Sequence, residues 1–216
     1  MKLIIGNKNY SSWSLRPWLL MAHHQLAFDE ERIPLDEPGT KDRILKASAA
    51  GKVPVLKDGD LTVWDSLAIC EYVSEKYLEN RGWPADINAR AEARAVSAEM
   101  HSGLSAIRGQ MPMNCRATGR SVPMTPELEQ EIARVDSLWS HYRQKYGANG
   151  SWLFGEFSIA DCMFAPVTSR FVTYGVALSD TARAYQQQVL NSEAMQAWVQ
   201  AGREETEIVE ADEAGA

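Results

Sequence analysis

The pattern of apolar and polar positions divides the chain into two halves with different periodicities. In the first 80 residues, short apolar runs alternate with stretches of helical spacing. The compact apolar run at residues 3–5 predicts a strand, and residues 15–26 follow it with the spacing of a helix. Residues 28–35 carry Ile33 and Leu35 among charged side chains, which predicts a second, more exposed strand.

Two further apolar runs, residues 53–56 and 61–64, are separated by a short polar segment that contains Asp58-Gly59. Asp-Gly between two apolar runs predicts a hairpin, because glycine supplies the positive φ that the turn needs. A helix over residues 66–78 follows. The order of strand, helix, strand, hairpin and helix predicts an α/β domain over residues 1–80.

No strand signal follows Gly82-Trp83-Pro84. Met100, Leu104, Ile107 and Met111 recur at spacings of four and three, which indicates a helix. Thr125 followed by Pro126 predicts the start of a helix that ends at Gly147. Two more helices fit residues 159–174 and 181–203. We therefore expect an all-helical domain over residues 88–210, with the boundary at residues 79–87.

Composition limits the function classes. The chain is 45% hydrophobic and 24% charged, and no apolar run approaches the ~20 residues of a membrane helix. A formal net charge of −7 argues against a nucleic-acid partner. Acidic residues crowd positions 204–213, which predicts a solvated, frayed tail.

The three cysteines lie far apart, without a C-x-x-C motif, which argues against a disulfide framework and favours reduced thiols in the cytoplasm. His23-His24 has no acidic or cysteine partner at ligand spacing, so we expect no metal site.

The segment from residue 9 to residue 17 is the first candidate for chemistry. Pro17 lacks a backbone N–H and is comfortable only in the first turn of a helix, so we expect the helix to start near Trp13 or Ser14, with Ser14 as its cap. Ser11 and Ser12 would then lie in the loop before its positive end, where an anion such as a thiolate is stabilised. A second interpretation is that these serines only cap the helix and turn the chain.

Two other motifs lie at element starts. Lys52-Val53-Pro54 places a proline at the start of a strand, either as an ordinary edge residue or as a cis-proline that shapes a binding surface. Asp65-Ser66 precedes the helix after the hairpin. Capping of that helix is the first role we expect there, and binding of a carboxylate is an additional one.

Together these motifs resemble the cytosolic glutathione transferase family over almost the whole chain. Ser-Ser-x-Ser-x-Arg at residues 11–16 resembles its zeta-like branch, and Val53-Pro54 resembles its cis-proline step. Residues 65–69 resemble its (Glu/Gln)-Ser-x-Ala-Ile segment, and residues 158–161 resemble its capping box in the helical domain. The resemblance implies an N-terminal thioredoxin-like domain followed by a C-terminal helical bundle, as a homodimer.

The resemblance also implies roles for individual residues. Ser11 aligns with the serine that stabilises the glutathione thiolate, and Ser12 with its neighbour in the loop. Val53 would pair its backbone with the cysteinyl unit next to Pro54, and Lys52 would help with a carboxylate. Asp65 and Ser66 would hold the γ-glutamyl end. The implied reaction is attack by activated glutathione on a small electrophile.

The chain departs from the family pattern at two positions. Trp13 stands in place of the cysteine that typically follows the two serines in the zeta branch, and Asp65 stands where glutamate or glutamine is commoner. The missing cysteine argues against maleylacetoacetate isomerase, since the thiol belongs to the signature of that branch. Two alternatives to a transferase are nevertheless kept: a glutathione-dependent cis-trans isomerase similar to maleylacetoacetate isomerase, and a non-catalytic binding or regulatory protein. The resemblance further implies that residues 99–102 and 108–116 face the thiol and form the pocket for the second substrate. His101 is a further candidate for acid–base work.

Overall fold

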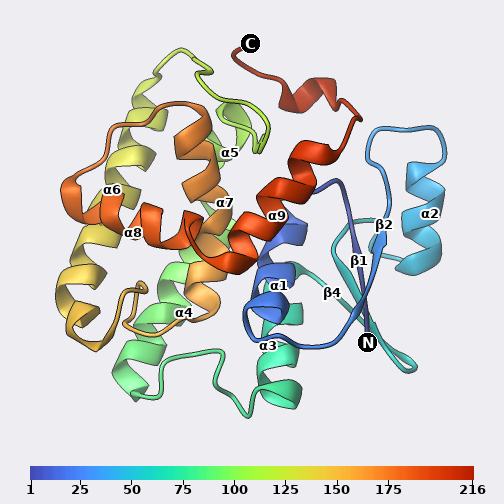
Figure 1. The fold of residues 1–216 in the computed structure, drawn as a ribbon, viewed down its shortest axis with the longest axis horizontal. Coiled ribbons are helices and arrows are strands. Elements are labelled where there is room, and N and C mark those ends of the chain that lie inside the picture. The colour runs from blue at the N-terminus through green and yellow to red at the C-terminus, as the bar shows by residue number, and fades with distance from the viewer.

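A four-stranded sheet with three helices precedes a bundle of helices in the computed structural model, which describes residues 1–216. The sheet part contains β1 (Lys2–Ile5), α1 (Ser12–His23), β2 (Asp29–Arg32), α2 (Thr40–Ala47), β3 (Val55–Asp58), β4 (Leu61–Trp64) and α3 (Ser66–Tyr77). The bundle contains α4 (Ile87–Ser102), α5 (Ser105–Gln110), α6 (Pro126–Tyr146), α7 (Ile159–Thr173), α8 (Asp180–Leu190) and α9 (Glu193–Glu204). The predicted fold class, a thioredoxin-like domain followed by a helical one, is confirmed (Figure 1).

The sheet has the strand order β2-β1-β3-β4. β1 pairs parallel with β2, whereas β3 pairs antiparallel with both β1 and β4. The predicted hairpin is β3 and β4, and Gly59 in its turn has a φ of +59°, in the region that favours glycine. The exposed strand expected in residues 28–35 is β2, whose four residues are all exposed.

Both faces of the sheet are covered, because the apolar runs of the central strands send alternate side chains to opposite faces. Leu3 and Ile5 belong to the main hydrophobic core, which α1 and α3 share. Ile4 between them packs with Val55 and with Ile44 of α2 in a smaller cluster on the other face. A strand buried on both faces reads as an unbroken apolar run, as residues 3–5 do.

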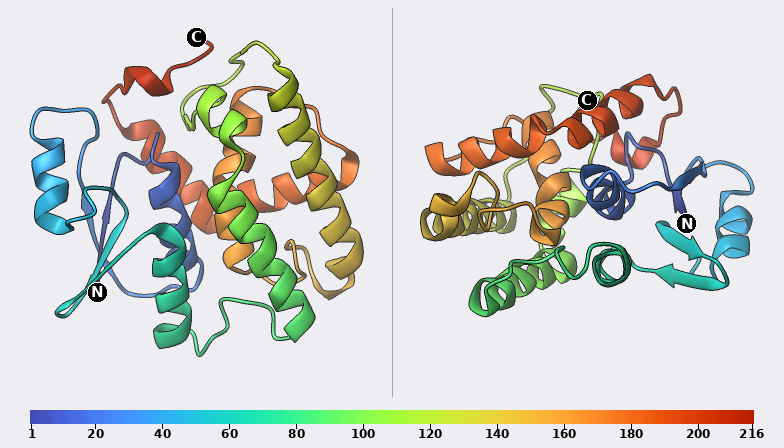
Figure 2. Two further views of the ribbon diagram at one scale, coloured as in Figure 1. Left: turned by 180° about the vertical axis from the view of Figure 1, so that it is seen from behind. Right: turned by 60° about the horizontal axis from the view of Figure 1, so that its bottom comes forward.

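The two parts meet along α1 and α7. α1 contacts both α3 and α7, and in Figure 2 it lies between the sheet and the bundle. α7 is buried along almost its whole length. The predicted capping box at its start is confirmed, with Ser158 and Asp161 satisfying each other's backbone N–H groups. α1 therefore has a fixed position with respect to both parts.

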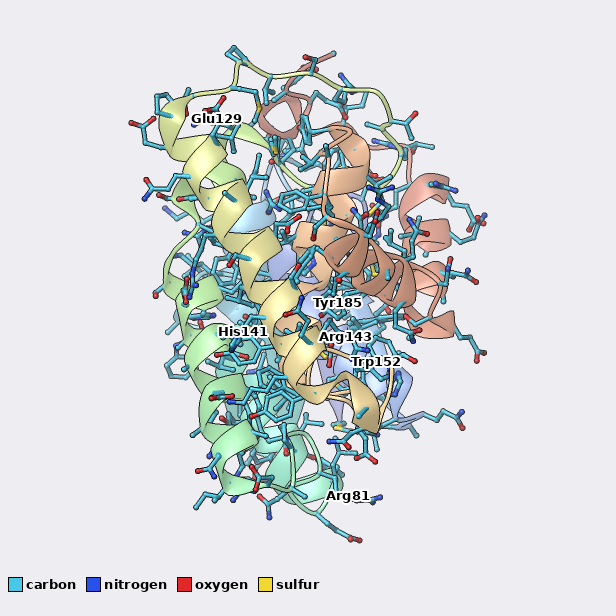
Figure 3. The ribbon with its side chains drawn as sticks, turned by 90° about the vertical axis from the view of Figure 1, so that its left-hand side faces the viewer. Arg81, Glu129, His141, Arg143, Trp152 and Tyr185 are labelled. Carbon is cyan, nitrogen blue, oxygen red and sulfur yellow. The ribbon has the colours of Figure 1, made fainter.

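The bundle also confirms the predicted start of α6, where Thr125 accepts from the backbone N–H of Leu128. Figure 3 looks onto α6, and Arg143 near its end donates to the carbonyl oxygen of Trp152 in the following loop. Inside the bundle, the Tyr185 hydroxyl donates to Asp161 over 2.9 Å. No helix combines the length and the apolar character that crossing a bilayer requires.

Two predicted helices are interrupted. The helical spacing from Met100 to Met111 is broken between α4 and α5 by Gly103 and by Leu104, whose φ is +53°. A Cβ at Gly103 would lie 2.8 Å from the carbonyl oxygen of Glu99, so this turn requires glycine.

The helix expected over residues 181–203 is instead two helices, α8 and α9. Ser192 between them has extended backbone angles, and its hydroxyl donates to the carbonyl of Val189 over 2.7 Å. Such a side-chain bond competes with the helical backbone pattern. The apolar spacing continues on both sides of the break, so the spacing alone did not reveal the break.

The prediction of a frayed tail over residues 204–213 is wrong. After α9 the chain folds back onto the loop between β1 and α1, as the red segment at the top of Figure 1 shows. The Glu205 carboxylate, with 8% of its side chain exposed, accepts from the backbone N–H groups of Lys8 (2.8 Å) and Asn9 (3.0 Å).

Other acidic side chains of this segment pair with distant partners. Glu207 forms an ion pair with Arg32 at 2.7 Å, and Glu213 accepts from the Tyr10 hydroxyl at 2.7 Å and pairs with Arg120. Glu205, Glu207 and Glu213 therefore have partners within the fold. Their partners lie far away in the sequence, which is why local charge patterning predicted solvation instead.

Candidate active site

A cleft of about 1030 Å³ lies between the sheet part and the bundle. Every predicted site residue lines it: Ser11, Ser12, Lys52, Val53, Pro54, Asp65 and Ser66. The bundle contributes Ser105, Arg108, Gly109, Pro112, Met113 and Arg170, and the C-terminal segment adds Asp212. The structure thus brings the predicted residues together at one surface. Of the residues expected to form the second-substrate pocket, Arg108, Gly109, Pro112 and Met113 line the cleft, whereas residues 99–102, 110, 111 and 114–116 do not.

Helix α1 begins earlier than predicted. Its first residue is Ser12 and its N-cap is Ser11, whose hydroxyl accepts from the backbone N–H of Ser14 at 3.4 Å. Ser14 is therefore not the cap. Pro17 did not limit the start as expected, because its missing N–H removes only the bond to the carbonyl of Trp13 in the first turn.

The two serines that face the cleft have different partners. The Ser11 hydroxyl donates to the Ser14 hydroxyl over 2.7 Å. The Ser12 hydroxyl instead accepts from the guanidinium of Arg170, over 3.0 Å. Both serines are buried at the positive end of α1, where backbone N–H groups and the helix dipole favour an anion.

At the start of α3, Asp65 is the predicted cap. One of its carboxylate oxygens accepts from the backbone N–H groups of Leu67 (2.9 Å) and Ala68 (3.4 Å), which confirms that prediction. The other oxygen lies 3.0 Å from Nε2 of His101. The neighbouring Ser66 is fully buried, and its hydroxyl accepts from Arg16 at 3.3 Å.

His101 bridges the two parts of the protein. Its Nε2 faces Asp65 and its Nδ1 lies 3.3 Å from the guanidinium of Arg16. Arginine can only donate, so Nδ1 accepts and Nε2 carries the proton that is donated to Asp65. Burial lowers the pKa of His101, although Asp65 opposes this effect. The ring is therefore neutral at pH 7, with both nitrogens occupied, and this arrangement favours a positioning role over acid–base work.

Arg16 is a functional candidate to which sequence reasoning gave no role. Its side chain is completely buried, lies 4.0 Å from the ring of Trp13, and contacts Ser66 and His101. It links the start of α1 to the start of α3 and so fixes the two capped ends with respect to each other. The signal in the sequence was a lone arginine, next to Pro17, in a first helix that contains no other arginine, lysine or acidic residue.

Besides the starts of α1 and α3, the segment before β3 forms a third wall of the cleft. The peptide bond between Val53 and Pro54 is cis, the form implied by the resemblance. Pro54 is buried, whereas Lys52 is exposed and forms no ion pair. This segment faces the same cleft as the starts of α1 and α3.

The cleft carries more positive than negative charge. Arg108 and Arg170 line it without an ion pair, and Arg16 lies just behind it. Burial lowers the pKa of Arg170 to about 10 and that of Arg16 to about 9, so both stay protonated at neutral pH. The acidic residues in the lining are Asp65 and Asp212. Its electrostatics therefore suit an anionic ligand.

Comparison with known proteins agrees with this geometry. Residues 10–76 match the family model of the glutathione S-transferase N-terminal domain. Human glutathione S-transferase theta-1 is 31% identical over 125 residues, which cover 56% of this chain and 52% of the human protein. The chain spans about half the length of the first curated relatives it matches.

Solved structures resemble the chain along nearly its whole length. A glutathione transferase homologue from Burkholderia, solved with bound glutathione, has a TM-score of 0.72 at 21% identity. The match covers 94% of this chain and 98% of the homologue. Maleyl pyruvate isomerase, a bacterial zeta-class enzyme, has a TM-score of 0.72 at 18% identity. That match covers 96% of this chain and 100% of the isomerase chain. Residues 10–76 therefore match the N-terminal domain model of the glutathione S-transferases, and the chain shares the fold of the solved glutathione transferases along nearly its whole length.

Proposed function

We propose that this protein is a glutathione transferase that binds glutathione in the cleft and activates its thiol for attack on a small electrophile. The observation that carries the proposal is the convergence of three walls on one surface. Hydroxyl groups lie at the start of α1, a cis-proline segment precedes β3, and Asp65 and Ser66 lie at the start of α3. The bound glutathione of the Burkholderia homologue supports the choice of ligand.

Each part of glutathione would meet a suitable group. The γ-glutamyl end would lie at Asp65 and Ser66, where a carboxylate can meet the N-terminus of α3 and an ammonium can meet the Asp65 side chain. The backbone of Val53 would pair with the cysteinyl unit, and Lys52 would attract a carboxylate. The sulfur would then lie near Ser11 and Ser12.

At that place a thiolate is favoured over a thiol. The N-terminus of α1 and a serine hydroxyl both stabilise the charged form, so the pKa of the bound thiol falls below that of a free thiol. The thiol proton leaves to solvent, and the thiolate sulfur forms the new bond to the electrophilic carbon. With a chloroarene as the electrophile, the carbon–chlorine bond then breaks and chloride leaves with the bonding electron pair. Holding both reactants in one cleft adds the advantage of proximity.

One observation favours a second function, glutathione-dependent isomerisation. Arg108 and Arg170 line the bundle side of the cleft without carboxylate partners, so they could hold an anionic substrate. A solved structure with a similar fold is maleyl pyruvate isomerase. Under this alternative, substrate turns over while the glutathione concentration stays constant, which separates it from the transferase.

The proposal is tested by titrating the protein with glutathione in a calorimeter and then measuring turnover of an activated chloroarene with and without glutathione. We expect saturable binding and a glutathione-dependent rate that consumes the thiol. Ser66→Ala removes a buried hydroxyl from the cleft and should weaken binding. The absence of any heat of binding would contradict the proposal and favour a non-catalytic role for the fold.

A further inference from the structure

The two serines at the start of α1 differ in whether their hydroxyl proton is free to be donated to a ligand. Ser11 uses its oxygen to accept from the backbone N–H of Ser14 and its proton to donate to the Ser14 hydroxyl. Ser14 in turn accepts from the backbone N–H of Gly6 over 3.1 Å. The Ser11 proton is therefore already donated to the Ser14 hydroxyl, and a bound sulfur would have to break that bond to receive it.

Ser12 has the opposite arrangement. Its oxygen accepts from the guanidinium of Arg170 at 3.0 Å, and the protein offers no acceptor for its proton. A hydroxyl whose oxygen accepts from a cation on one side directs its proton to another side. Because Ser12 lines the cleft, that proton is available to a ligand there.

Arg170 is held firmly in this position from the bundle side. Its side chain is nearly fully buried, and its guanidinium donates to the carbonyl oxygens of Met111 (2.6 Å) and Arg108 (3.2 Å). It forms no ion pair, and its Nε atom is buried without a partner. The acidic group that interacts with it is Asp212, which also lines the cleft but forms no direct ion pair with it. A buried cation without a direct carboxylate contact is costly for the fold, which points to a role in the cleft.

We propose that Ser12, and not Ser11, donates the hydrogen bond to the glutathione sulfur, and that Arg170 is the positioning residue that keeps the Ser12 proton free for it. This inference rests on the proposed glutathione binding and specifies how the thiolate is held. The cationic donor withdraws electron density from the Ser12 hydroxyl and so strengthens the bond that Ser12 donates. The bundle thereby contributes to thiol activation without touching the sulfur.

The serine assignment is tested by the pKa of the bound glutathione thiol, measured from the ultraviolet absorbance of the thiolate as a function of pH. Ser12→Ala should raise that pKa by about one unit or more, towards the value of ~8.5 for a free thiol. Ser11→Ala is the matched control and should raise it by less. A larger shift for Ser11→Ala than for Ser12→Ala would overturn the assignment.

The role of Arg170 is tested by Arg170→Met, with Arg108→Met as the matched control. Both variants remove one cleft cation, but only Arg170→Met removes a donor to Ser12. We expect Arg170→Met to raise the thiol pKa more than Arg108→Met, and Arg170→Lys to restore part of the difference. Equal shifts would mean that positive charge alone matters, and would overturn the positioning role.

A double variant keeps the test independent of folding defects. If Arg170 acts through Ser12, Arg170→Met should change the thiol pKa far less in a Ser12→Ala background than in the wild type. Additive shifts would contradict the inference. Failure of wild-type protein to bind glutathione in calorimetry would instead overturn the proposed function itself, so the two failures are distinguishable.

Discussion

Asp65 uses its two carboxylate oxygens for different purposes. One caps α3 through the backbone N–H groups of Leu67 and Ala68, and the other meets His101 from the bundle. Under the proposed function the same side chain also meets the ammonium of the γ-glutamyl end. Stability and binding therefore depend on one residue and have to be separated by experiment.

Asp86 provides the matched control, because it caps α4 with the same pair of backbone bonds. Replacing either aspartate by alanine should cost about 0.5–2 kcal/mol of unfolding free energy, through loss of the cap. Only Asp65→Ala should also weaken glutathione binding. Urea unfolding and calorimetry measure the two effects, and equal affinities in both variants would argue against the place assigned to the γ-glutamyl end.

For single residues, the sequence predicts the roles that depend on neighbours in the chain. The caps at Asp65 and Thr125 follow from residues within one turn, and both are confirmed. The predicted cap of α1 is Ser14, whereas the cap in the structure is Ser11. Three serines lie within four residues here, so side-chain geometry decides which of them caps the helix. The contact of Arg16 with His101 joins residues from different parts of the fold, and no local pattern reveals it.

Among the elements, the segment after α9 differs most from its prediction. Glu205 satisfies two backbone N–H groups in the loop between β1 and α1, and that loop leads directly into Ser11 and Ser12. An acidic run that follows the end of a helix is typical of a solvated tail. Here its partners are backbone and side-chain groups of the sheet part, together with Arg120 between α5 and α6. Only the folded chain brings these groups close to the acidic residues.

Glu205→Ala should leave those two N–H groups without an acceptor, at a cost of about 1–3 kcal/mol in the free energy of unfolding. The neighbouring Glu204 is the control, since its carboxylate is exposed and contacts only Gln200 one turn earlier. Glu204→Ala should change stability by no more than about 0.5 kcal/mol. Equal urea midpoints for the two variants would show that the C-terminal segment does not hold the loop.

For the whole molecule, the order of elements was enough to predict the class of fold. The fold class followed from a set of long-range patterns: apolar runs of strand length, an Asp-Gly hairpin and a second half without strands. These patterns stay recognisable even where the end of a single helix is predicted wrongly. We propose residues 1–80 and 88–210 as the two domains, on either side of the segment that joins α3 to α4. The cleft could be predicted only on its sheet side, where motifs mark it. Its opposite wall depends on how the bundle packs, and nothing in the sequence singles out Arg170 as a partner of Ser12.

The central claim is that glutathione lies across the starts of α1, β3 and α3, with its sulfur at Ser12. A crystal structure of the protein with glutathione tests it most directly. We expect the sulfur within hydrogen-bond distance of the Ser12 hydroxyl, the cysteinyl backbone beside Val53, and the γ-glutamyl end at Asp65 and Ser66. A sulfur bound to Ser11 with the Ser12 hydroxyl turned away, or glutathione bound outside this cleft, would contradict the account.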